Sequence, residues 1–322
     1  MIKILANDGI SAAGKQQLEA AGFLVVTENV PQEQLIDDIN NKQYDVLLVR
    51  SATKIRKDII DACPSLKLLG RGGVGMDNID VDYARSKGLT VVNTPASSSQ
   101  SVAELVIGQL FSISRMTFDS ERKMPSANTK EVFNELKKKY GKGVELRGKT
   151  LGIIGFGRIG KSIAQYAIGC GMNVIAYDGF AKKSSEDITI DIANQKITVS
   201  INYVSKDDLL AQSDYISINV PMPEDGKAVL CSNCLKKVKK GVRIVNAARG
   251  GVVDEAALLE ALNDGRVAAA ALDVFENEPV VNPAILSHPK IALTPHIGAA
   301  TNEAQDRIGG ELADIIIAHF KN

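Results

Sequence analysis

The strongest constraint on the fold is the stretch of residues 149–178, KTLGIIGFGRIGKSIAQYAIGCGMNVIAYD. Its first apolar run, Leu151–Ile154, is typical of a strand buried on both faces of a parallel sheet. The glycine pattern GxGxxG follows, and then apolar residues recur at helical spacing. A second apolar run, Val174–Tyr177, ends at Asp178. The stretch therefore predicts a strand, a tight turn, a helix and a second strand.

Three glycines and the terminal acid of this stretch indicate a dinucleotide-binding unit. Gly155 permits the sharp turn, Gly157 lets a pyrophosphate approach the backbone, and Gly160 lets the helix pack closely on the strand. The N–H groups at the start of the helix favour an anion. Asp178 can accept hydrogen bonds from both ribose hydroxyls and repels a 2′-phosphate, so we expect NAD rather than NADP. The alternative is a glycine turn without a ligand.

Length and charge bound the class of protein. A chain of 322 residues, 45% of them hydrophobic, is long enough for two domains. It carries 38 Lys and Arg against 38 Asp and Glu, so net charge gives no indication of nucleic acid or membrane as a partner. The N-terminus has neither a basic segment nor a long apolar core, which favours a cytoplasmic protein.

Short apolar runs alternate with helical patterns along most of the chain, which predicts parallel doubly wound α/β domains. We expect strands at 2–6, 23–27, 46–49, 66–69, 90–92, 197–201, 215–219, 243–246, 268–272 and 291–293, besides the two described above. We expect helices at 11–21, 31–40, 57–62, 81–87, 102–114, 255–262 and 302–320. The last helix is amphipathic and is expected to pack back on the first domain. The predicted domains are 1–97 plus 294–322 and 98–293.

Three local patterns carry further expectations. Ser101 and Glu104 have the spacing of a capping box before the 102–114 helix. The basic segment 130–149 is expected to be a solvated loop, with a ligand contact as the alternative. Cys231 and Cys234 form a CxxC pair without a second pair of ligands nearby, so we expect reduced surface thiols near a helix start and no metal.

Of the three histidines, His296 is the candidate for chemistry. It follows a predicted strand, and ligands bind at the carboxyl edge of open parallel sheets. An imidazole can give a proton to a ketone oxygen while hydride reaches the carbon. Glu278 is a candidate to hold the other ring nitrogen, and Arg249 follows another strand and can bind a carboxylate through its planar fork. We expect His288 and His319 to be solvated or capping residues.

Five motifs in order resemble the D-isomer-specific 2-hydroxyacid dehydrogenase family, and the likeness covers essentially the whole chain. They are GRGGVGMDNID at 70–80, GFGRIG at 155–160 with Asp178, NAARGG at 246–251, ALDVFENEP at 271–279 and PHIGA at 295–299. The resemblance implies a Rossmann NAD-binding domain inserted in a flavodoxin-like substrate-binding domain. Departures from the family pattern are Ser98, Asn219 and the absence of tryptophan.

The resemblance also implies roles for single residues. The catalytic arginine, glutamate and histidine would be Arg249, Glu278 and His296. Cofactor contacts would come from Val74, Gly155, Gly157, Arg158, Ile159, Gly160, Asp178, Val220, Pro221, Ala247, Asp273, His296 and Gly298. Substrate contacts would come from Arg50, Ser51, Arg71, Val74, Gly75, Arg249 and His296.

The family members most like this chain oxidise 3-phospho-D-glycerate to 3-phosphohydroxypyruvate with NAD, reversibly, as the first step of L-serine synthesis. We therefore expect a phosphorylated 2-hydroxy or 2-keto acid as substrate and a homodimer. Because the chain stops just after its last helix, we expect no regulatory domain and no feedback inhibition by serine. One alternative is a hydroxypyruvate or glyoxylate reductase, and another is a non-catalytic NAD-sensing scaffold.

Overall fold

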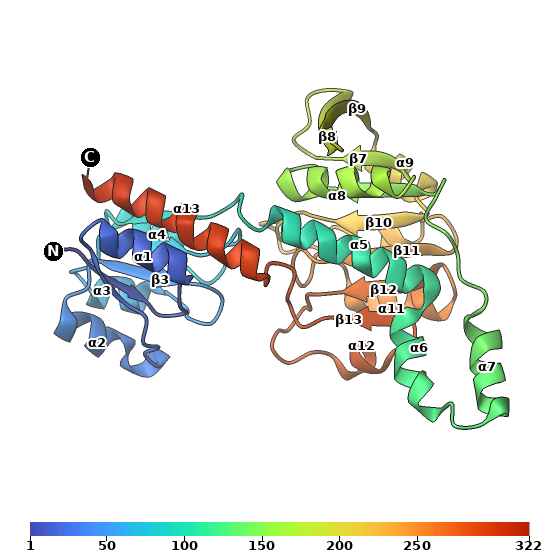
Figure 1. Ribbon diagram of the computed structural model, residues 1–322, viewed down its shortest axis with the longest axis horizontal. Coiled ribbons are helices and arrows are strands. Elements are labelled where there is room, and N and C mark those ends of the chain that lie inside the picture. The colour runs from blue at the N-terminus through green and yellow to red at the C-terminus, as the bar shows by residue number, and fades with distance from the viewer. Residues whose placement is uncertain (322) are drawn as a thin grey trace. The chain divides into compact units, whose positions relative to one another are not determined.

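The chain folds into two compact units. The computed structural model describes residues 1–321. Unit 1 comprises Met1–Ser101 together with the segment that begins at Ala299, and unit 2 comprises Val102–Gly298. Each unit is built on one largely parallel sheet with helices on its faces (Figure 1). The predicted α/β class with two doubly wound sheets is confirmed.

Unit 1 holds a five-stranded parallel sheet in the order β2-β1-β3-β4-β5, the flavodoxin-like order. Its strands are β1 (Lys3–Ala6), β2 (Leu24–Val26), β3 (Val46–Val49), β4 (Leu68–Arg71) and β5 (Thr90–Asn93). Its helices are α1 (Ala12–Ala20), η1 (Gln32–Gln34), α2 (Leu35–Lys42), α3 (Lys57–Ala62), α4 (Val81–Ser86) and α13 (Asn302–Lys321). Every strand predicted in this part of the sequence is present within two residues of its expected bounds.

The last helix, α13, packs on the sheet of unit 1, as the sequence predicted. Ile308, Leu312 and Ile316 lie in one core cluster with Ile4 and Leu18 of the first two elements. Gly14 of α1 faces Gly309 of α13 so closely that a Cβ on Gly14 would lie 2.7 Å from the Gly309 carbonyl carbon. Within residues 1–321, neither α13 nor any other helix combines the length and hydropathy needed to cross a membrane.

Unit 2 holds an eight-stranded sheet in the order β13-β12-β11-β10-β6-β7-β9-β8, parallel except for β8. Its strands are β6 (Thr150–Ile154), β7 (Asn173–Tyr177), β8 (Ser185–Ile192), β9 (Gln195–Tyr203), β10 (Tyr215–Ile218), β11 (Val242–Asn246), β12 (Val267–Leu272) and β13 (Ile291–Leu293). Its helices are α5 (Ser99–Arg115), α6 (Thr117–Lys123), η2 (Met124–Ser126), α7 (Lys130–Tyr140), α8 (Arg158–Gly169), α9 (Lys206–Gln212), α10 (Ser232–Leu235), α11 (Glu255–Asn263) and α12 (Pro283–Ser287).

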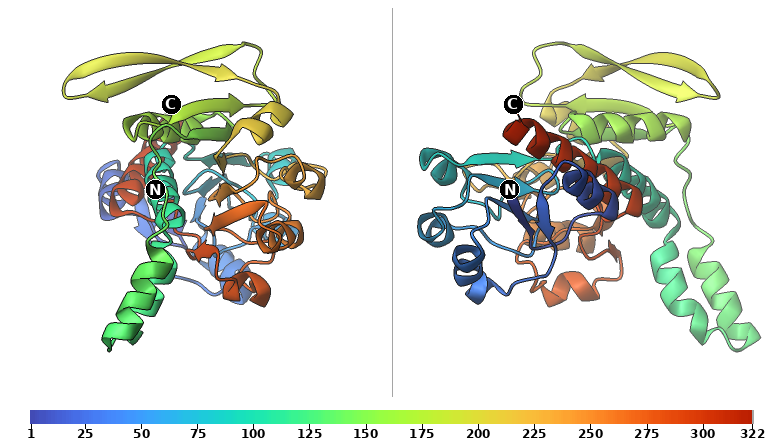
Figure 2. Two further views of the ribbon diagram at one scale, coloured as in Figure 1. Left: turned by 90° about the vertical axis from the view of Figure 1, so that its right-hand side faces the viewer. Right: turned by 60° about the vertical axis from the view of Figure 1, so that its left-hand side comes forward.

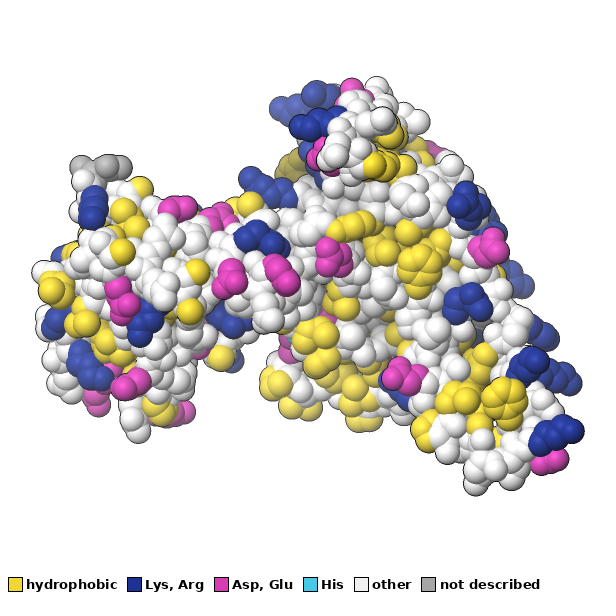
Figure 3. All heavy atoms as spheres, in the orientation of Figure 1, with side chains coloured by type: hydrophobic (Ala, Val, Ile, Leu, Met, Phe, Trp, Pro, Cys, Tyr) yellow, Lys and Arg dark blue, Asp and Glu magenta, His cyan; other side chains and the backbone are white. Residues whose placement is uncertain are grey.

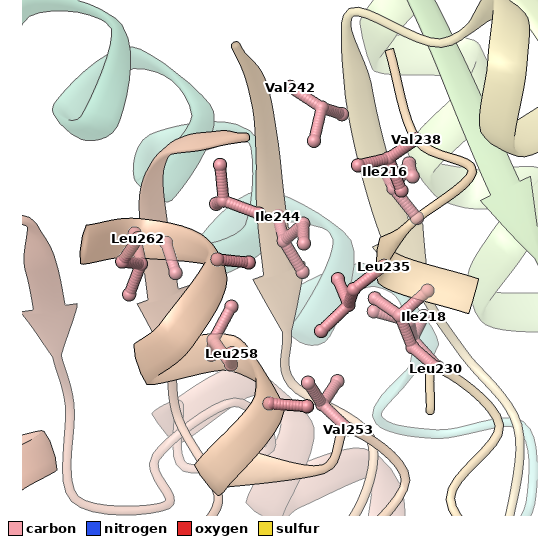
Figure 4. Packing of buried hydrophobic residues seen from close by; sticks show 14 of the residues in the cluster. Ile216, Ile218, Leu230, Leu235, Val238, Val242, Ile244, Val253, Leu258 and Leu262 are labelled. Atoms are coloured by element: carbon pink, nitrogen blue, oxygen red, sulfur yellow. The ribbon is translucent and has the colours of Figure 1, made fainter. Parts of the chain in front are cut away.

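The main core cluster of unit 2 includes residues of α11, β10 and β11. Leu258 and Leu262 of α11 lie against Ile244 of β11, and Ile216 and Ile218 of β10 are in the same cluster (Figure 4). All five side chains are fully buried. Burial of such a side chain contributes roughly 1.5–3 kcal/mol. The rigid strands that result end at the edge where the candidate site lies.

The segment 130–149 is not simply a solvated loop, because its first half is the helix α7. The Thr129 hydroxyl caps this helix by accepting the Val132 N–H. Lys139 and Tyr140 both bond to the Asp119 carboxylate, which ties α7 to α6. No residue of α7 is buried, but Val132, Phe133, Leu136 and Tyr140 recur close to helical spacing along it, so the sequence does carry a helical pattern beside its lysines. Together α6 and α7 project from the body of unit 2 (Figure 2).

The predicted capping box at Ser101 is wrong, because α5 begins two residues earlier, at Ser99. Ser101 is already inside the helix, and its hydroxyl bonds to that of Thr301. The Glu104 carboxylate accepts a hydrogen bond from the Tyr166 hydroxyl. Local spacing alone did not reveal these partners, which are distant in the sequence.

The polar region after Asp178 contains two strands where the sequence predicted one. β8 and β9 form an antiparallel hairpin at the edge of the sheet. Ala193 and Asn194 form its turn with φ of 47° and 67°, the left-handed backbone that two-residue hairpins favour. The hairpin projects beyond the rest of unit 2 (Figure 2), and Ile188, Ile190 and Ile192 of β8 alternate with polar residues, which is the pattern of a strand with one buried face.

Candidate active site

Three neighbouring strands of unit 2 bring the predicted catalytic residues to one edge of the sheet. In the parallel register, Asn246 of β11 pairs with Leu272 of β12, and Leu272 pairs with Leu293 of β13. Arg249 follows the first strand, Glu278 the second and His296 the third. The three side chains thus come from adjacent loops at the carboxyl edge, where ligands bind in sheets of this kind.

His296 and Glu278 are in direct contact. The distance between His296 Nδ1 and Glu278 Oε2 is 2.8 Å. An ionised carboxylate only accepts hydrogen bonds, so Nδ1 carries the proton and Nε2 is left as the acceptor of the neutral ring. The other oxygen, Oε1, accepts the Phe275 N–H at 2.9 Å, which fixes the carboxylate plane. The predicted pairing of these residues is therefore present, with the two side chains 43% and 34% exposed.

Asp273 holds the loop that carries His296. Its carboxylate accepts three hydrogen bonds: from the Thr294 hydroxyl at 2.6 Å, the Ile297 N–H at 2.9 Å and the Gly298 N–H at 2.8 Å. The His296 N–H also donates to the Asp273 carbonyl, and the side chain of Asp273 is almost fully buried. These bonds support His296 in its left-handed backbone conformation, φ 55°. The loop 294–298 belongs to unit 2, whereas the sequence predicts a boundary at residue 294, with the loop in the outer domain.

Asn246 shapes the loop that carries Arg249. Its side-chain oxygen accepts the Ala248 N–H at 3.1 Å, and its side-chain nitrogen donates to the Arg249 carbonyl at 2.9 Å. The Arg249 guanidinium donates to the Ala248 carbonyl at 2.7 Å. A Cβ on Gly250 would overlap the Phe275 carbonyl, so the Arg249 loop packs directly on the loop that leads to Glu278.

Two acidic residues outside the predicted site join the same loops. Glu255, the first residue of α11, and Glu276 each accept the other's backbone N–H at 2.9 Å. Burial raises the pKa of the Glu255 carboxyl, with the nearby Glu276 carboxylate adding to the effect. A glutamate at a helix start is common, so only the tertiary contact distinguishes this one. Asn246, within the NAARGG motif, was likewise identified only by its contacts.

The glycine turn after β6 has the form that a dinucleotide requires. Gly155 has φ 87°, and a Cβ there would lie 2.6 Å from the Asn219 carbonyl oxygen and from the Val220 side chain. A Cβ on Gly160 would overlap the Gly155 carbonyl, so α8 packs closely on the strand. No described atom lies within 4 Å of a Cβ built on Gly157, which leaves the backbone open to an approaching group.

The first turn of α8 adds anion-binding capacity to that opening. Gly157 is the N-cap residue, and none of the described side chains caps the helix that begins with Arg158 and Ile159. Its N–H groups and the positive end of the helix dipole therefore remain available to a phosphate. Asp178 follows β7. Its Oδ2 accepts the Phe156 N–H at 2.9 Å, and its Oδ1 accepts the Phe180 N–H at 2.9 Å. Each oxygen keeps a lone pair for a hydroxyl. The residues present fit a bound dinucleotide.

Five of the predicted substrate residues lie in unit 1, at or just after the ends of β3 and β4: Arg50, Ser51, Arg71, Val74 and Gly75. The Arg50 side chain passes 3.6 Å from a Cβ built on Gly72, and the Arg71 guanidinium covers Gly73. The Arg50 N–H donates to the Asp8 carboxylate at 2.7 Å, and the Gly73 N–H donates to the Thr94 hydroxyl at 2.7 Å. Both arginines therefore flank one glycine loop, which continues to Val74 and Gly75. Ser51 is exposed beside Arg50.

The two other histidines lie apart from these loops in the chain and have local partners. His288 ends α12, and its Nδ1 accepts the Lys290 N–H at 3.2 Å. Burial lowers the pKa of the His288 ring. The ring of His319 contacts that of Phe320 edge to face near the end of α13.

Comparison with known proteins agrees with this geometry. Residues 107–298 match the family model of the D-isomer specific 2-hydroxyacid dehydrogenase, NAD binding domain. The chain is 39% identical over 322 residues to D-3-phosphoglycerate dehydrogenase of Bacillus subtilis, covering all of this chain and 57% of that protein. It therefore spans little more than half the length of that relative. It is 41% identical over 318 residues to hydroxypyruvate reductase of Thermotoga maritima, covering 98% of this chain and 97% of that one.

Solved structures show the same likeness. The holo form of D-mandelate dehydrogenase of Rhodotorula graminis superposes with a TM-score of 0.85 at 25% identity, covering 99% of this chain and 94% of that one. A glyoxylate reductase of Paecilomyes thermophila superposes with a TM-score of 0.80 at 30% identity, covering 99% and 93%. The predicted resemblance is confirmed: the chain belongs to the D-isomer specific 2-hydroxyacid dehydrogenase family.

Proposed function

We propose that this protein catalyses the NAD-dependent, reversible oxidation of 3-phospho-D-glycerate to 3-phosphohydroxypyruvate. The observation that carries the proposal is the 2.8 Å contact of His296 with Glu278, in a loop adjoining the one that holds Arg249. An imidazole with one nitrogen fixed by a carboxylate can exchange a proton through the other. A protein that only binds a nucleotide would have no need of the His296–Glu278 pair.

Proton exchange at His296 is the step that the chain itself performs. In the direction of oxidation, His296 Nε2 takes the proton of the hydroxyl group on C2 of the substrate, while a hydride leaves C2 itself. The Glu278 carboxylate stabilises the imidazolium that results. In the reverse direction the same nitrogen returns the proton to the ketone oxygen. Arg249 would bind the substrate carboxylate and polarise the adjacent carbonyl.

NAD is the proposed cofactor, and when bound it supplies the hydride acceptor. Gly155, Gly157 and Gly160 would admit its pyrophosphate to the start of α8. The Asp178 carboxylate would accept hydrogen bonds from the adenosine ribose hydroxyls and would repel a 2′-phosphate. Steady-state rates with NADH and NADPH test this assignment, since a clear preference for NADPH would contradict the role of Asp178. A Sinorhizobium meliloti relative with 26% identity is described as an NADPH-dependent glyoxylate/hydroxypyruvate reductase, so the comparison is informative.

A phosphorylated substrate is favoured by the arginine pair of unit 1. Arg50 and Arg71 flank the Gly72–Gly73 turn, and a phosphate needs at least one charge-assisted partner. One such hydrogen bond contributes about 1.5–3 kcal/mol, which corresponds to roughly a tenfold to hundredfold change in affinity. Arg50→Ala should therefore raise KM for phosphohydroxypyruvate by that factor.

The deciding experiment measures NADH oxidation with phosphohydroxypyruvate and with hydroxypyruvate on the wild type and on two arginine variants. Arg85→Ala is the matched control, because Arg85 is exposed in the last turn of α4, and none of the described hydrogen bonds or ion pairs joins its side chain to the glycine loop. We expect kcat/KM to favour the phosphorylated acid in the wild type and in Arg85→Ala. The preference should shrink in Arg50→Ala. Equal kcat/KM values in the wild type would overturn the phosphate assignment.

A reductase of unphosphorylated acids is the second candidate. The observation that favours it is the 41% identity to a hydroxypyruvate reductase along 97% of that protein's length. Higher kcat/KM with hydroxypyruvate or glyoxylate in the same experiment would select it. A third outcome, tight NADH binding without turnover of any 2-keto acid, would instead favour a non-catalytic NAD-sensing scaffold.

We also propose that the protein is a homodimer formed through unit 2. Phe111 of α5, Met124 of η2 and Phe133 of α7 are 49%, 44% and 48% exposed. Hydrophobic side chains gather on the face around α5 and near the ends of α6 and α7 (Figure 3). Such surface is commonly covered by a partner. Light scattering of the purified protein tests the proposal, and a monomer mass at micromolar concentration would contradict it.

A further inference from the structure

A pair of cysteines in unit 2 lies outside the proposed catalytic machinery. Cys231 is the N-cap residue of the short helix α10, and Cys234 lies within that helix. Their sulfur atoms are 2.8 Å apart. Both residues are free thiols of intermediate exposure. Within residues 1–321 no group of three or more His, Cys, Asp or Glu side chains is arranged to hold a metal ion. The two sulfurs therefore form a vicinal dithiol rather than part of a described metal site.

The surroundings of the two sulfurs differ. Cys234 contacts the main core cluster of unit 2, and its sulfur lies 3.5 Å from the Val229 carbonyl oxygen. The Lys206 ammonium donates to the same carbonyl, which places a positive charge beside the pair. The hydrogen bond from Cys234 lowers the pKa of the Cys231 thiol, whereas burial raises that of Cys234. Cys231 is therefore the sulfur suited to attack, and Cys234 is the one suited to resolve.

We propose that Cys231 and Cys234 are a thiol–disulfide exchange site that forms a reversible intramolecular disulfide. The oxidant is a small-molecule disulfide, R–S–S–R. The Cys231 thiolate attacks one sulfur of R–S–S–R, and the S–S bond of this oxidant breaks. The first RS⁻ leaves and takes a proton from water. Cys234 then loses its proton, attacks the Cys231 sulfur and releases the second RS⁻. Two protein thiols are oxidised, and one disulfide is reduced to two RSH.

Little movement is needed for this bond. A disulfide has an S–S distance of about 2.05 Å, so the sulfurs must approach by less than about 1 Å. The backbone of Cys231 is extended, with φ −84° and ψ 173°, and the helix returns Cys234 to the same side. A CxxC pair at a helix start is the arrangement used by disulfide-exchanging proteins.

The same chain supplies two control thiols. Cys63, in unit 1, is buried, and burial raises its pKa to about 11. Burial also raises the pKa of Cys170, which ends α8. Neither is adjacent in sequence to another cysteine. They should stay reduced under conditions that oxidise the pair.

The test equilibrates the folded protein with oxidised glutathione, then unfolds it in a thiol-alkylating reagent and maps the four cysteines by mass spectrometry. We expect Cys63 and Cys170 to be alkylated and the peptide with Cys231 and Cys234 to carry an internal disulfide. Dithiothreitol should restore alkylation at both. In Cys234→Ser, Cys231 should accumulate as the mixed disulfide with glutathione, at least tenfold faster than Cys170 does.

Four alkylated cysteines after equilibration, or mixed disulfides without an internal bond in the wild type, would overturn the proposal. Stoichiometric zinc in the purified protein would also overturn it, because the thiolates would then be metal ligands. Circular dichroism of Cys231→Ser and Cys234→Ser checks that both variants fold. If either variant does not fold, the cysteine mapping of the wild type still tests the proposal.

Discussion

Replacing Glu278 by glutamine tests the proposed proton exchange most directly. Glu278 Oε1 accepts the Phe275 N–H at 2.9 Å, and Oε2 faces His296 Nδ1 at 2.8 Å. A glutamine has only one oxygen for these two positions. Its oxygen should remain on the Phe275 N–H, because leaving that donor opposite an NH₂ group costs about 1–3 kcal/mol. The NH₂ group then faces Nδ1, so His296 must take the tautomer with the proton on Nε2.

The wrong tautomer should cost much of the activity. With its proton on Nε2, the neutral ring cannot take the substrate proton. The same change in a serine-protease triad lowers kcat about 10⁴-fold. Because the side chains of His296 and Glu278 are 43% and 34% exposed, solvent screens part of the charge. We therefore expect a smaller loss, about 10²–10³-fold in kcat, or about 3–4 kcal/mol.

The assay is the steady-state oxidation of the hydroxy acid by NAD, with NADH binding measured separately. Glu276→Gln is the matched control two residues away: its amide oxygen can still accept the Glu255 N–H, and no contact joins the Glu276 side chain to His296 among those described. We expect the control to retain near-normal kcat and both variants to bind NADH. If Glu278→Gln kept more than a tenth of the wild-type kcat, the tautomer argument would be refuted.

Three further predictions follow from the geometry. Gly157→Ala should leave the melting temperature unchanged but weaken NADH binding more than tenfold, as measured by titration. Gly169→Ala is the control, because a Cβ there is equally free of neighbours, and it should bind NADH normally. Unchanged NADH binding in Gly157→Ala would contradict a pyrophosphate at Gly157. Asp273→Asn places an NH₂ group against one of the three donors that the Asp273 carboxylate accepts. The free energy of unfolding, measured by urea titration, should therefore fall by about 1.5–3 kcal/mol. An unchanged midpoint of urea unfolding would argue against the role of Asp273 in the loop. Burial raises the pKa of Glu255, so its ionisation destabilises the folded state and the stability of the wild type falls as pH rises through that pKa. Glu255→Gln should therefore melt higher than the wild type at pH 8, with no difference below about pH 4, where the carboxyl is protonated in both states; a gain that persists in acid would contradict this cause.

Recognition of elements from sequence succeeded where one face of an element is buried. The strand Val46–Val49 was predicted with the observed bounds, because it is a central parallel strand and is apolar throughout. Helix α7 and strand β8 were not predicted, because charged and polar residues outnumber the apolar ones in both. The apolar spacing is nevertheless present, at Leu136 and Tyr140 of α7 and at Ile188 and Ile190 of β8, so the composition of these segments concealed a pattern that they do carry.

The α/β class, the glycine turn at 155–160 and the candidate residues could all be predicted from the amino-acid sequence. Each depends on local backbone geometry or on apolar spacing within one element. The contact of Glu278 with His296 and the hydrogen bonds from the His296 loop to Asp273 depend instead on the folded arrangement of the strands. The same is true of the packing of Gly250 on Phe275. These contacts join residues on different strands, and the strand order and register that bring them together arise from packing of the whole sheet.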